Sequence, residues 1–344
     1  MAYSGRVVDM HAHTVAPPEL YQFKANLLSS RGYGDAKPPS YPDERVDDFA
    51  KRNIAIMDSV GTDIQFLSPR PFQLMNSEKP AKIVDVWCQA NNNVIAQQVR
   101  LHPDRFRGVA GLPFLAGEHS GPGDLSMAIE ELERCVNEMG FIGCLINPDL
   151  WEGTIADGAY SPNMGDEYWY PLYEKMVELG VPGHIHTAGC KNGRESYSNH
   201  FITEGTIALL GLVNSNVYKD FPDLKIVVSH GGGSVPYQIG RWQAARWMHY
   251  GPEAVRFEED LHKLYFDTVL YTKESLDLLF KICGTDRCMF GTEKPGSGSG
   301  QDPQTGLWKD DTKPVIDSIE WLSDEDKKNI FDGNVYNVFP HFKV

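Results

Sequence analysis

The chain has 344 residues, of which 47 are acidic and 32 basic, and its formal net charge is −15. Such a charge argues against a general binder of nucleic acids or anionic membranes. The sequence has no apolar run long enough to cross a membrane, and its six cysteines follow no disulfide or metal-binding spacing. We expect no signal peptide. We therefore expect a cytoplasmic protein with reduced thiols.

Eight short β-rich segments recur along the chain, separated by longer segments that include helical patterns. The predicted strands span residues 6–11, 63–70, 105–113, 140–148, 181–187, 224–233, 264–270 and 287–293. Apolar residues at helical spacing mark several of the intervening segments, among them 127–139 and 168–180. This alternation predicts βαβ units with parallel strands. Eight units favour an α/β fold with one (β/α)8 TIM-type barrel domain over residues 1–344.

Two segments interrupt the alternation. Residues 14–50 follow the first strand and are rich in Pro, Tyr and Gly, and residues 294–314 follow the last strand. Both insertions would lie at the C-terminal face of the barrel, where barrel enzymes build their active sites. Long loops in this position often act as lids, although “GSGSG” within the second insertion also fits an irregular excursion.

The first predicted strand leads into the stretch “VVDMHAH”, which carries two histidines one residue apart. Alternate side chains of a strand point to the same side, so His11 and His13 would point together. Two imidazoles directed at one point suit a metal ion. The alternative is a pair of solvated histidines at a strand end.

Other predicted strands also end in residues that ligate metals or bind anions. A convergent site explains this coincidence better than any one residue does. His184 lies two residues before the strand-five histidine and faces the same way, one layer deeper, so it is either a core histidine or a rival ligand. The strand-end residues are Arg70, Asn147, His186, His230 and Glu293.

The set “HAH”, a histidine ending strand five, “SHGGG” and the acidic residue of “MFGTEKP” resembles the amidohydrolase superfamily. The closer match is its decarboxylase-and-hydratase branch, which is similar to aminocarboxymuconate semialdehyde decarboxylase. The resemblance extends from “VVDMHAH” to “DGNVYNVFP”. It implies a zinc ion held by His11, His13 and His186, with His230 facing the substrate. Mn²⁺ or Fe²⁺ would suit the same ligands.

Two positions refine this resemblance. The fourth strand, “GFIGCLINP”, lacks the lysine that bridges two ions in other members of the superfamily, which implies a single metal ion. Glu293 stands where decarboxylases of the branch carry aspartate, and this resembles the oxalomesaconate hydratases. Glu293 would then ligate the metal or act as a general base.

The resemblance thus implies a hydro-lyase that adds water to a C=C bond of an unsaturated keto di- or tricarboxylic acid from aromatic ring cleavage. A zinc ion would lower the pKa of the attacking water toward about 7. One alternative is a non-oxidative decarboxylase of an aromatic or muconic acid. Another is a hydrolase of a lactone such as a pyrone dicarboxylate.

Arginine and amide side chains near the strand ends are candidates for binding substrate carboxylates. Arg70 and Asn147 end strands two and four, and Arg241 follows “SHGGGSVPY” by a few residues. Arginine suits a carboxylate because its planar fork donates two parallel hydrogen bonds. Either arginine can instead pair with a surface carboxylate, and Lys294 is a weaker candidate. The expected ligand is therefore a small anionic carboxylate.

The loop after the fifth strand departs from the hydratase pattern. The resemblance implies a cysteine acting as general acid and then a tyrosine, whereas the loop reads “HTAGCKNGRESYSNHF”. Cys190 is its only thiol and the candidate general acid. Phe201 stands where the tyrosine is expected, with Tyr197 nearby.

Relatives of this branch often form dimers or higher oligomers. The resemblance therefore also implies a homo-oligomer, a dimer or higher.

Overall fold

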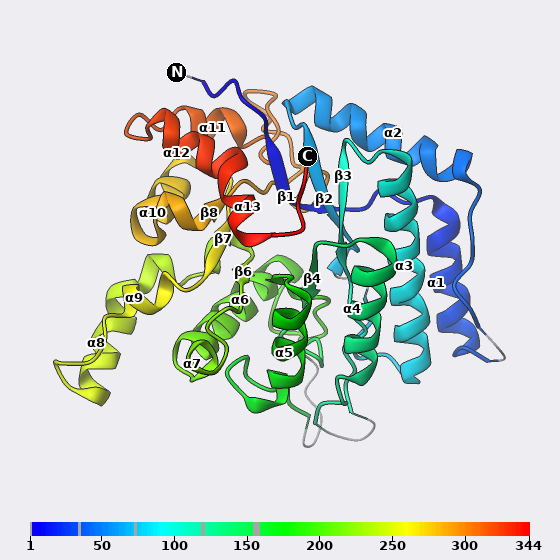
Figure 1. The fold of residues 1–344 in the computed structure, drawn as a ribbon, viewed down its shortest axis with the longest axis horizontal. Helices are drawn as coiled ribbons and strands as arrows, with labels where there is room; N and C mark the ends of the chain where they lie inside the picture. Colours follow the sequence, from blue (N-terminus) through cyan, green and yellow to red (C-terminus); the bar gives the residue numbers. More distant parts are fainter. Residues whose placement is uncertain (1, 34–35, 72–73, 118–120, 154–158) are drawn as a thin grey trace.

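A computed structural model describes residues 2–33, 36–71, 74–117, 121–153 and 159–344 of the chain (Figure 1). Eight parallel strands form one sheet in which each strand pairs with the next one along the chain. The strands are β1 (Val8–His13), β2 (Ile64–Ser68), β3 (Phe106–Ala110), β4 (Gly143–Ile146), β5 (Gly183–Ile185), β6 (Ile226–Val228), β7 (Tyr265–Asp267) and β8 (Cys288–Met289).

The sheet curves into a nearly closed barrel. The Met10 amide donates to the Phe290 carbonyl (2.9 Å) and the Glu293 amide donates to the His11 carbonyl (2.7 Å). These bonds join β1 to the segment after β8, so the last strand lies next to the first. The predicted (β/α)8 barrel is confirmed, and each predicted strand overlaps an observed one.

Helices alternate with the strands and surround the barrel (Figure 1). Most bury an apolar face against the sheet, as expected of amphipathic helices in this fold. None of the described helices combines the length and the apolar character needed to span a bilayer. In chain order they are α1 (Pro18–Ser30), α2 (Asp43–Val60), α3 (Ala81–Leu101), α4 (Ser126–Met139), α5 (Tyr170–Leu179), α6 (Tyr197–Val213), α7 (Val217–Asp220), α8 (Ile239–Tyr250), α9 (Phe257–Leu261), α10 (Lys273–Cys283), α11 (Lys313–Asp317), α12 (Asp324–Lys328) and α13 (Asn334–Val338).

The two insertions differ in structure. Residues 14–50 contain all of α1 and the beginning of α2, so most of this insertion is helical. Leu20 and Leu27 of α1 are buried in one apolar cluster with Trp87 of α3. Burying one leucine stabilises a fold by about 1.5–3 kcal/mol, which explains why a segment rich in Pro and Gly is ordered here. The second insertion is mostly irregular, with a single antiparallel bridge between Gln301 and Trp308.

The C-terminal segment packs against the starts of several strands. Phe339 and Phe342 each lie with their ring centroids 5.0 Å from that of Phe66. Val8 and Ile64, at the starts of β1 and β2, belong to the same buried cluster. This end of the barrel is therefore filled by apolar side chains, and the polar side chains gather at the strands' C-terminal ends.

Candidate metal centre

Three imidazoles and one carboxylate converge where the strands end. Each of the four side chains is buried and offers one ligand atom, and these atoms all lie within 4.8 Å of one another. β1 supplies two of them because its alternate side chains point to one side. We call these residues the metal-site cluster: His11, His13, His186 and Glu293.

Each imidazole of the metal-site cluster is oriented through its Nδ1 atom. That atom contacts an oxygen, so the Nε2 atom carries the lone pair and faces the centre of the cluster. The three Nε2 atoms are buried and have no hydrogen-bond partner among the described residues. The Nδ1 contacts are His11 with Asp267 Oδ2 (2.6 Å), His13 with Ser68 Oγ (2.9 Å), and His186 with the Thr187 carbonyl (2.9 Å).

The carboxylate lies at a distance from the imidazoles that suits a shared ion. Glu293 Oε1 is 3.4 Å from His13 Nε2 and 3.9 Å from His186 Nε2. Two atoms bound about 2.0–2.1 Å from a tetrahedral ion lie ~3.3 Å apart. Glu293 also adopts a positive φ of 59°, a strained backbone conformation for a residue with a side chain. The cluster thus fits one divalent metal ion.

The charge states of the ligands agree with this fit. Burial lowers the pKa of His11 to about 3 and that of His13 to about 4, so both imidazoles are neutral, as metal ligands must be. Burial acts to raise the pKa of Glu293. Its contacts with His13 and His186 outweigh this effect and hold that pKa well below its usual range. Glu293 is therefore a carboxylate at neutral pH.

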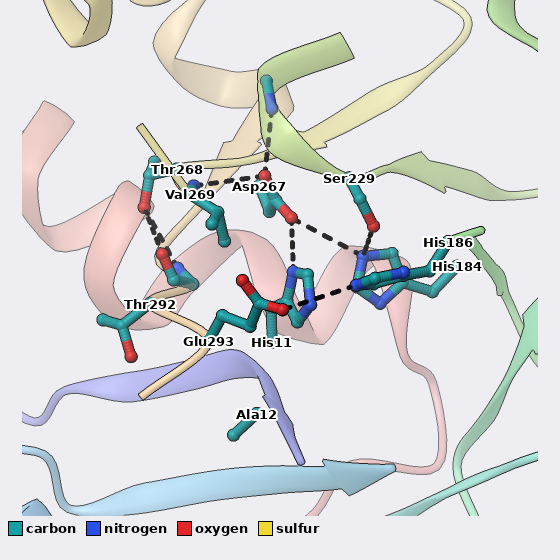
Figure 2. Close-up of polar contacts among 12 residues, drawn as sticks. His11, Ala12, His184, His186, Ser229, Asp267, Thr268, Val269, Thr292 and Glu293 are labelled. Carbon is teal, nitrogen blue, oxygen red and sulfur yellow. Dashed lines mark hydrogen bonds and ion pairs between the residues drawn. The ribbon is translucent and has the colours of Figure 1, made fainter. Parts of the chain in front are cut away.

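Asp267 at the end of β7 connects the metal-site cluster to the layer beneath it, as Figure 2 shows. Besides His11, it lies 3.7 Å from His184 Nε2, and it accepts a hydrogen bond from the Gly231 amide (3.0 Å). His184 also bonds Ser229 Oγ (2.8 Å). His184 thus has partners outside the metal-site cluster, which fits its interpretation as a core histidine. Asp267 lies within “FDT”, and the sequence pattern assigned it no role.

His230 lies beside the cluster in the turn after β6. Its ring centroid is 4.9 Å from that of His186, and the ring stacks on Phe201 at 5.6 Å. Its Nε2 atom is buried and has no hydrogen-bond partner among the described residues. Burial lowers the pKa of His230 to about 3. This turn has no room for a side chain at Gly232, since a Cβ there would lie 2.8 Å from the ring of Phe266.

A cavity of about 620 Å³ opens onto the metal-site cluster, which contributes His13 and Glu293 to its wall. Arg70 is the one cation that lines it within the described ranges, and Arg70 Nη2 donates to the Pro295 carbonyl (3.3 Å). Tyr197 forms another part of the wall. This cavity, called the active-site cavity below, can admit a small carboxylate next to the cluster.

Three residues predicted to bind substrate do not line this cavity. The Asn147 amide donates to the Asp149 carbonyl (2.8 Å) and so closes a turn after β4. Lys294 is buried and pairs with Asp310 (2.7 Å). Arg241 is exposed on α8, which projects away from the barrel (Figure 1).

Cys190 lines a different, adjacent cavity, and its thiol contacts the carbonyls of Asn192 and Glu195 at 3.8 Å.

A residue near Glu293 that the sequence pattern missed is Tyr271, after β7. Burial and the Glu293 charge raise the pKa of Tyr271. Strand-end spacing could not reveal Tyr271 because it lies four residues beyond its strand.

The protein is a parallel eight-stranded barrel with buried histidines and a glutamate at its strand ends. This combination is typical of a barrel enzyme with a site for a divalent metal. The chain belongs to the amidohydrolase family, whose profile matches residues 8–340. The resemblance predicted from the motifs is confirmed.

Two hydratases are similar to nearly the whole chain. The 2-keto-4-carboxy-3-hexenedioate hydratase of Sphingobium sp. (strain SYK-6) is 36% identical over 340 residues, or 97% of this chain and 96% of the relative. The structure of 4-oxalomesaconate hydratase from Rhodopseudomonas palustris has a TM-score of 0.83 and 32% identity, covering 97% and 96% of the two chains. A dihydroxybenzoic acid decarboxylase from Polaromonas sp. JS666, with bound manganese and an inhibitor, shares the fold. Its TM-score is 0.72 and its identity 23%, over 99% of this chain and 98% of that one.

Proposed function

We propose that this protein is a metal-dependent hydro-lyase that adds water to the C=C bond of an unsaturated keto di- or tricarboxylic acid, such as 4-oxalomesaconate. The observation that supports this most directly is the buried Glu293 carboxylate beside His13 and His186. Glutamate at this position matches the hydratase pattern, and similarity to two hydratases over 97% of the chain agrees with it.

We propose one Zn²⁺ ion in the metal-site cluster, with Mn²⁺ or Fe²⁺ as alternatives. Neutral imidazoles and a carboxylate suit all three ions, and a related barrel contains manganese. When bound, the ion supplies Lewis acidity that polarises water at neutral pH. Asp267 supports this site because it orients His11 and increases its basicity.

Addition of water to a conjugated C=C requires a base for the water and a donor for the resulting enolate. Glu293 is ionised at neutral pH and serves as the base that accepts the water proton. His230 faces the cluster with an unpartnered Nε2 atom and holds the hydroxyl group or exchanges a proton with it. Cys190 stays the predicted general acid, and its place in the adjacent cavity would require movement of the loop at 187–196.

Arg70 binds a substrate carboxylate in this proposal. It is the cation that lines the active-site cavity in the described part of the chain, and its guanidinium presents paired donors. A carboxylate on Arg70 would set the conjugated C=C against Glu293. Asn147, Arg241 and Lys294 stay weaker predictions for substrate contact because they have other partners or lie exposed.

The test is an incubation of metal-quantified protein with 4-oxalomesaconate, with the product followed by mass. A gain of one water supports the hydratase. Loss of carbon dioxide would favour the decarboxylase alternative, which the shared fold with a dihydroxybenzoic acid decarboxylase keeps open. Ring opening of a pyrone dicarboxylate with proton release would favour the lactone hydrolase.

We further propose a homo-oligomer in the cytoplasm, which sedimentation and cell fractionation would test.

A further inference from the structure

A second cavity of about 310 Å³ adjoins the active-site cavity, and Tyr197 lines both. We call it the lateral cavity. Its wall includes Lys24 and Leu28 from α1, Met75, and Cys190 and Lys191 from the loop after β5. Helix α1 belongs to the first insertion, so this insertion contributes directly to a hollow beside the active site.

The carboxylates of the lateral cavity already have cationic partners. Lys191 Nζ lies 3.3 Å from Glu78 Oε1 and 3.2 Å from Glu152 Oε2. Arg31 binds the other oxygen of Glu78 at 2.9 Å. These ion pairs leave neither carboxylate as a dedicated partner for a further cation.

Lys24 is the cation of this wall that lacks such a partner. Its side chain is half-buried, and no carboxylate lies within 4.0 Å of its ammonium group among the described residues. The ammonium lies 5.7 Å from the ring centroid of Trp87. Burial lowers the pKa of Lys24, and the charges of Glu152 and Glu78 only partly oppose this effect. A ligand carboxylate in the lateral cavity would give the ammonium group a direct ion-pair partner and reduce the cost of its burial.

Aromatic packing connects Tyr197, in the wall of the lateral cavity, to His230. The ring of Tyr197 packs edge-on against Phe201, with centroids 4.6 Å apart, and Phe201 stacks on His230. Tyr197 lies in the walls of both cavities, so a ligand that extends from one cavity into the other would pass this side chain.

We propose that the lateral cavity is the subsite for the substrate carboxylate remote from the reacting C=C bond, and that Lys24 is its cation. This inference rests on the proposed function and restricts it. The substrate carries at least two carboxylates, one bound at Arg70 in the active-site cavity and the other at Lys24 beyond Tyr197.

The first test is steady-state hydration of 4-oxalomesaconate by Lys24→Met. The inference predicts that KM rises about tenfold or more, the loss expected for one charge-assisted contact, while kcat stays close to that of the wild type. Lys24→Arg keeps the charge and should retain a KM near the wild-type value. Lys37→Met is the matched control, because Lys37 is an exposed lysine of the same insertion and should leave both constants unchanged.

The second test needs no turnover. Calorimetry on the metal-loaded protein compares glutarate, which has two carboxylates and can occupy both Arg70 and Lys24, with butyrate, which has one. The wild type should bind glutarate more tightly, and Lys24→Met should remove most of this difference. Equal affinities in the wild type, or an unchanged preference in Lys24→Met, would overturn the subsite. A wild type that leaves 4-oxalomesaconate unchanged but shows the preference would instead contradict the proposed function and keep the subsite.

Discussion

The Nδ1 atom of His11 lies 2.6 Å from Oδ2 of Asp267, and both side chains are fully buried. The two residues lie 256 positions apart in the chain and meet because β1 and β7 end at the same face of the barrel. Burial acts to raise the pKa of Asp267, but its hydrogen bond with His11 and its contact with His184 hold that pKa well below its usual range. The carboxylate therefore fixes the tautomer of His11 and directs its Nε2 atom into the cluster.

Asp267→Asn should weaken metal binding without unfolding the protein. The amide still accepts a hydrogen bond from Nδ1 but lacks the charge that increases the basicity of the imidazole. We expect the affinity for Zn²⁺ to fall by about 10–100-fold, measured by competition with a chelator. The control is Asp286→Asn, at an exposed carboxylate. Wild-type metal affinity in Asp267→Asn would contradict the orienting role.

Glu293→Gln should remove the base while preserving the shape of the side chain. Loss of a general base lowers kcat by about 10²–10⁴-fold, and loss of a charged ligand weakens metal binding as well. The measurement is kcat at saturating metal, with bound metal quantified in the same sample. Glu325→Gln changes an exposed glutamate on α12 and should match the wild type. Full activity in Glu293→Gln would exclude Glu293 as the base.

Arg70→Met should raise KM for the substrate by about 10–100-fold, because a carboxylate in the active-site cavity then lacks its cationic partner. The effect on kcat should be smaller. Arg241→Met provides the comparison. Its exposed position on α8 predicts an unchanged KM, whereas the sequence pattern predicts a rise. If only Arg241→Met raised KM, the assignment of the carboxylate to Arg70 would be wrong.

His200 predicts a pH dependence of stability. Although burial opposes it, contacts with Asp149 (3.2 Å) and Glu195 (2.9 Å) raise the pKa of His200 to about 9. A histidine with a raised pKa stabilises the fold fully below its unfolded pKa of about 6.5 and loses this contribution as pH rises toward 9. Burial raises the pKa of nearby Glu204 to about 7, which acts in the same direction.

The corresponding measurement is the free energy of unfolding of the wild type and of His200→Gln between about pH 6 and pH 10. Glutamine does not titrate, so the advantage of the wild type should be largest at the acidic end and shrink toward pH 9. A difference that stays constant or grows with pH would contradict the assigned protonation of His200.

The barrel and the metal-site cluster could be predicted from the sequence because both follow from local patterns. Strand-like segments alternate with helical ones, and alternate side chains of β1 place His11 and His13 on one side. The contact of Asp267 with His11 could not be predicted from the sequence, since it depends on which strands close the barrel. “FDT” alone does not indicate a partner for its aspartate.

The substrate-binding residues were harder to predict for a related reason. Residue type and position near a strand end do not reveal whether a side chain already has a partner. Asn147 closes its own turn and Lys294 pairs with Asp310, so neither faces the active-site cavity. Lys24 shows the converse, because its part in a cavity depends on the folding of a Pro- and Gly-rich insertion into α1.

The measurement that tests the central claim most directly is the product mass after incubation of 4-oxalomesaconate with protein of known metal content. We predict a gain of one water, its loss after the metal is removed with a chelator, and its return when Zn²⁺ or Mn²⁺ is restored. Unchanged substrate with the metal bound, or release of carbon dioxide in place of water uptake, would contradict the hydratase assignment.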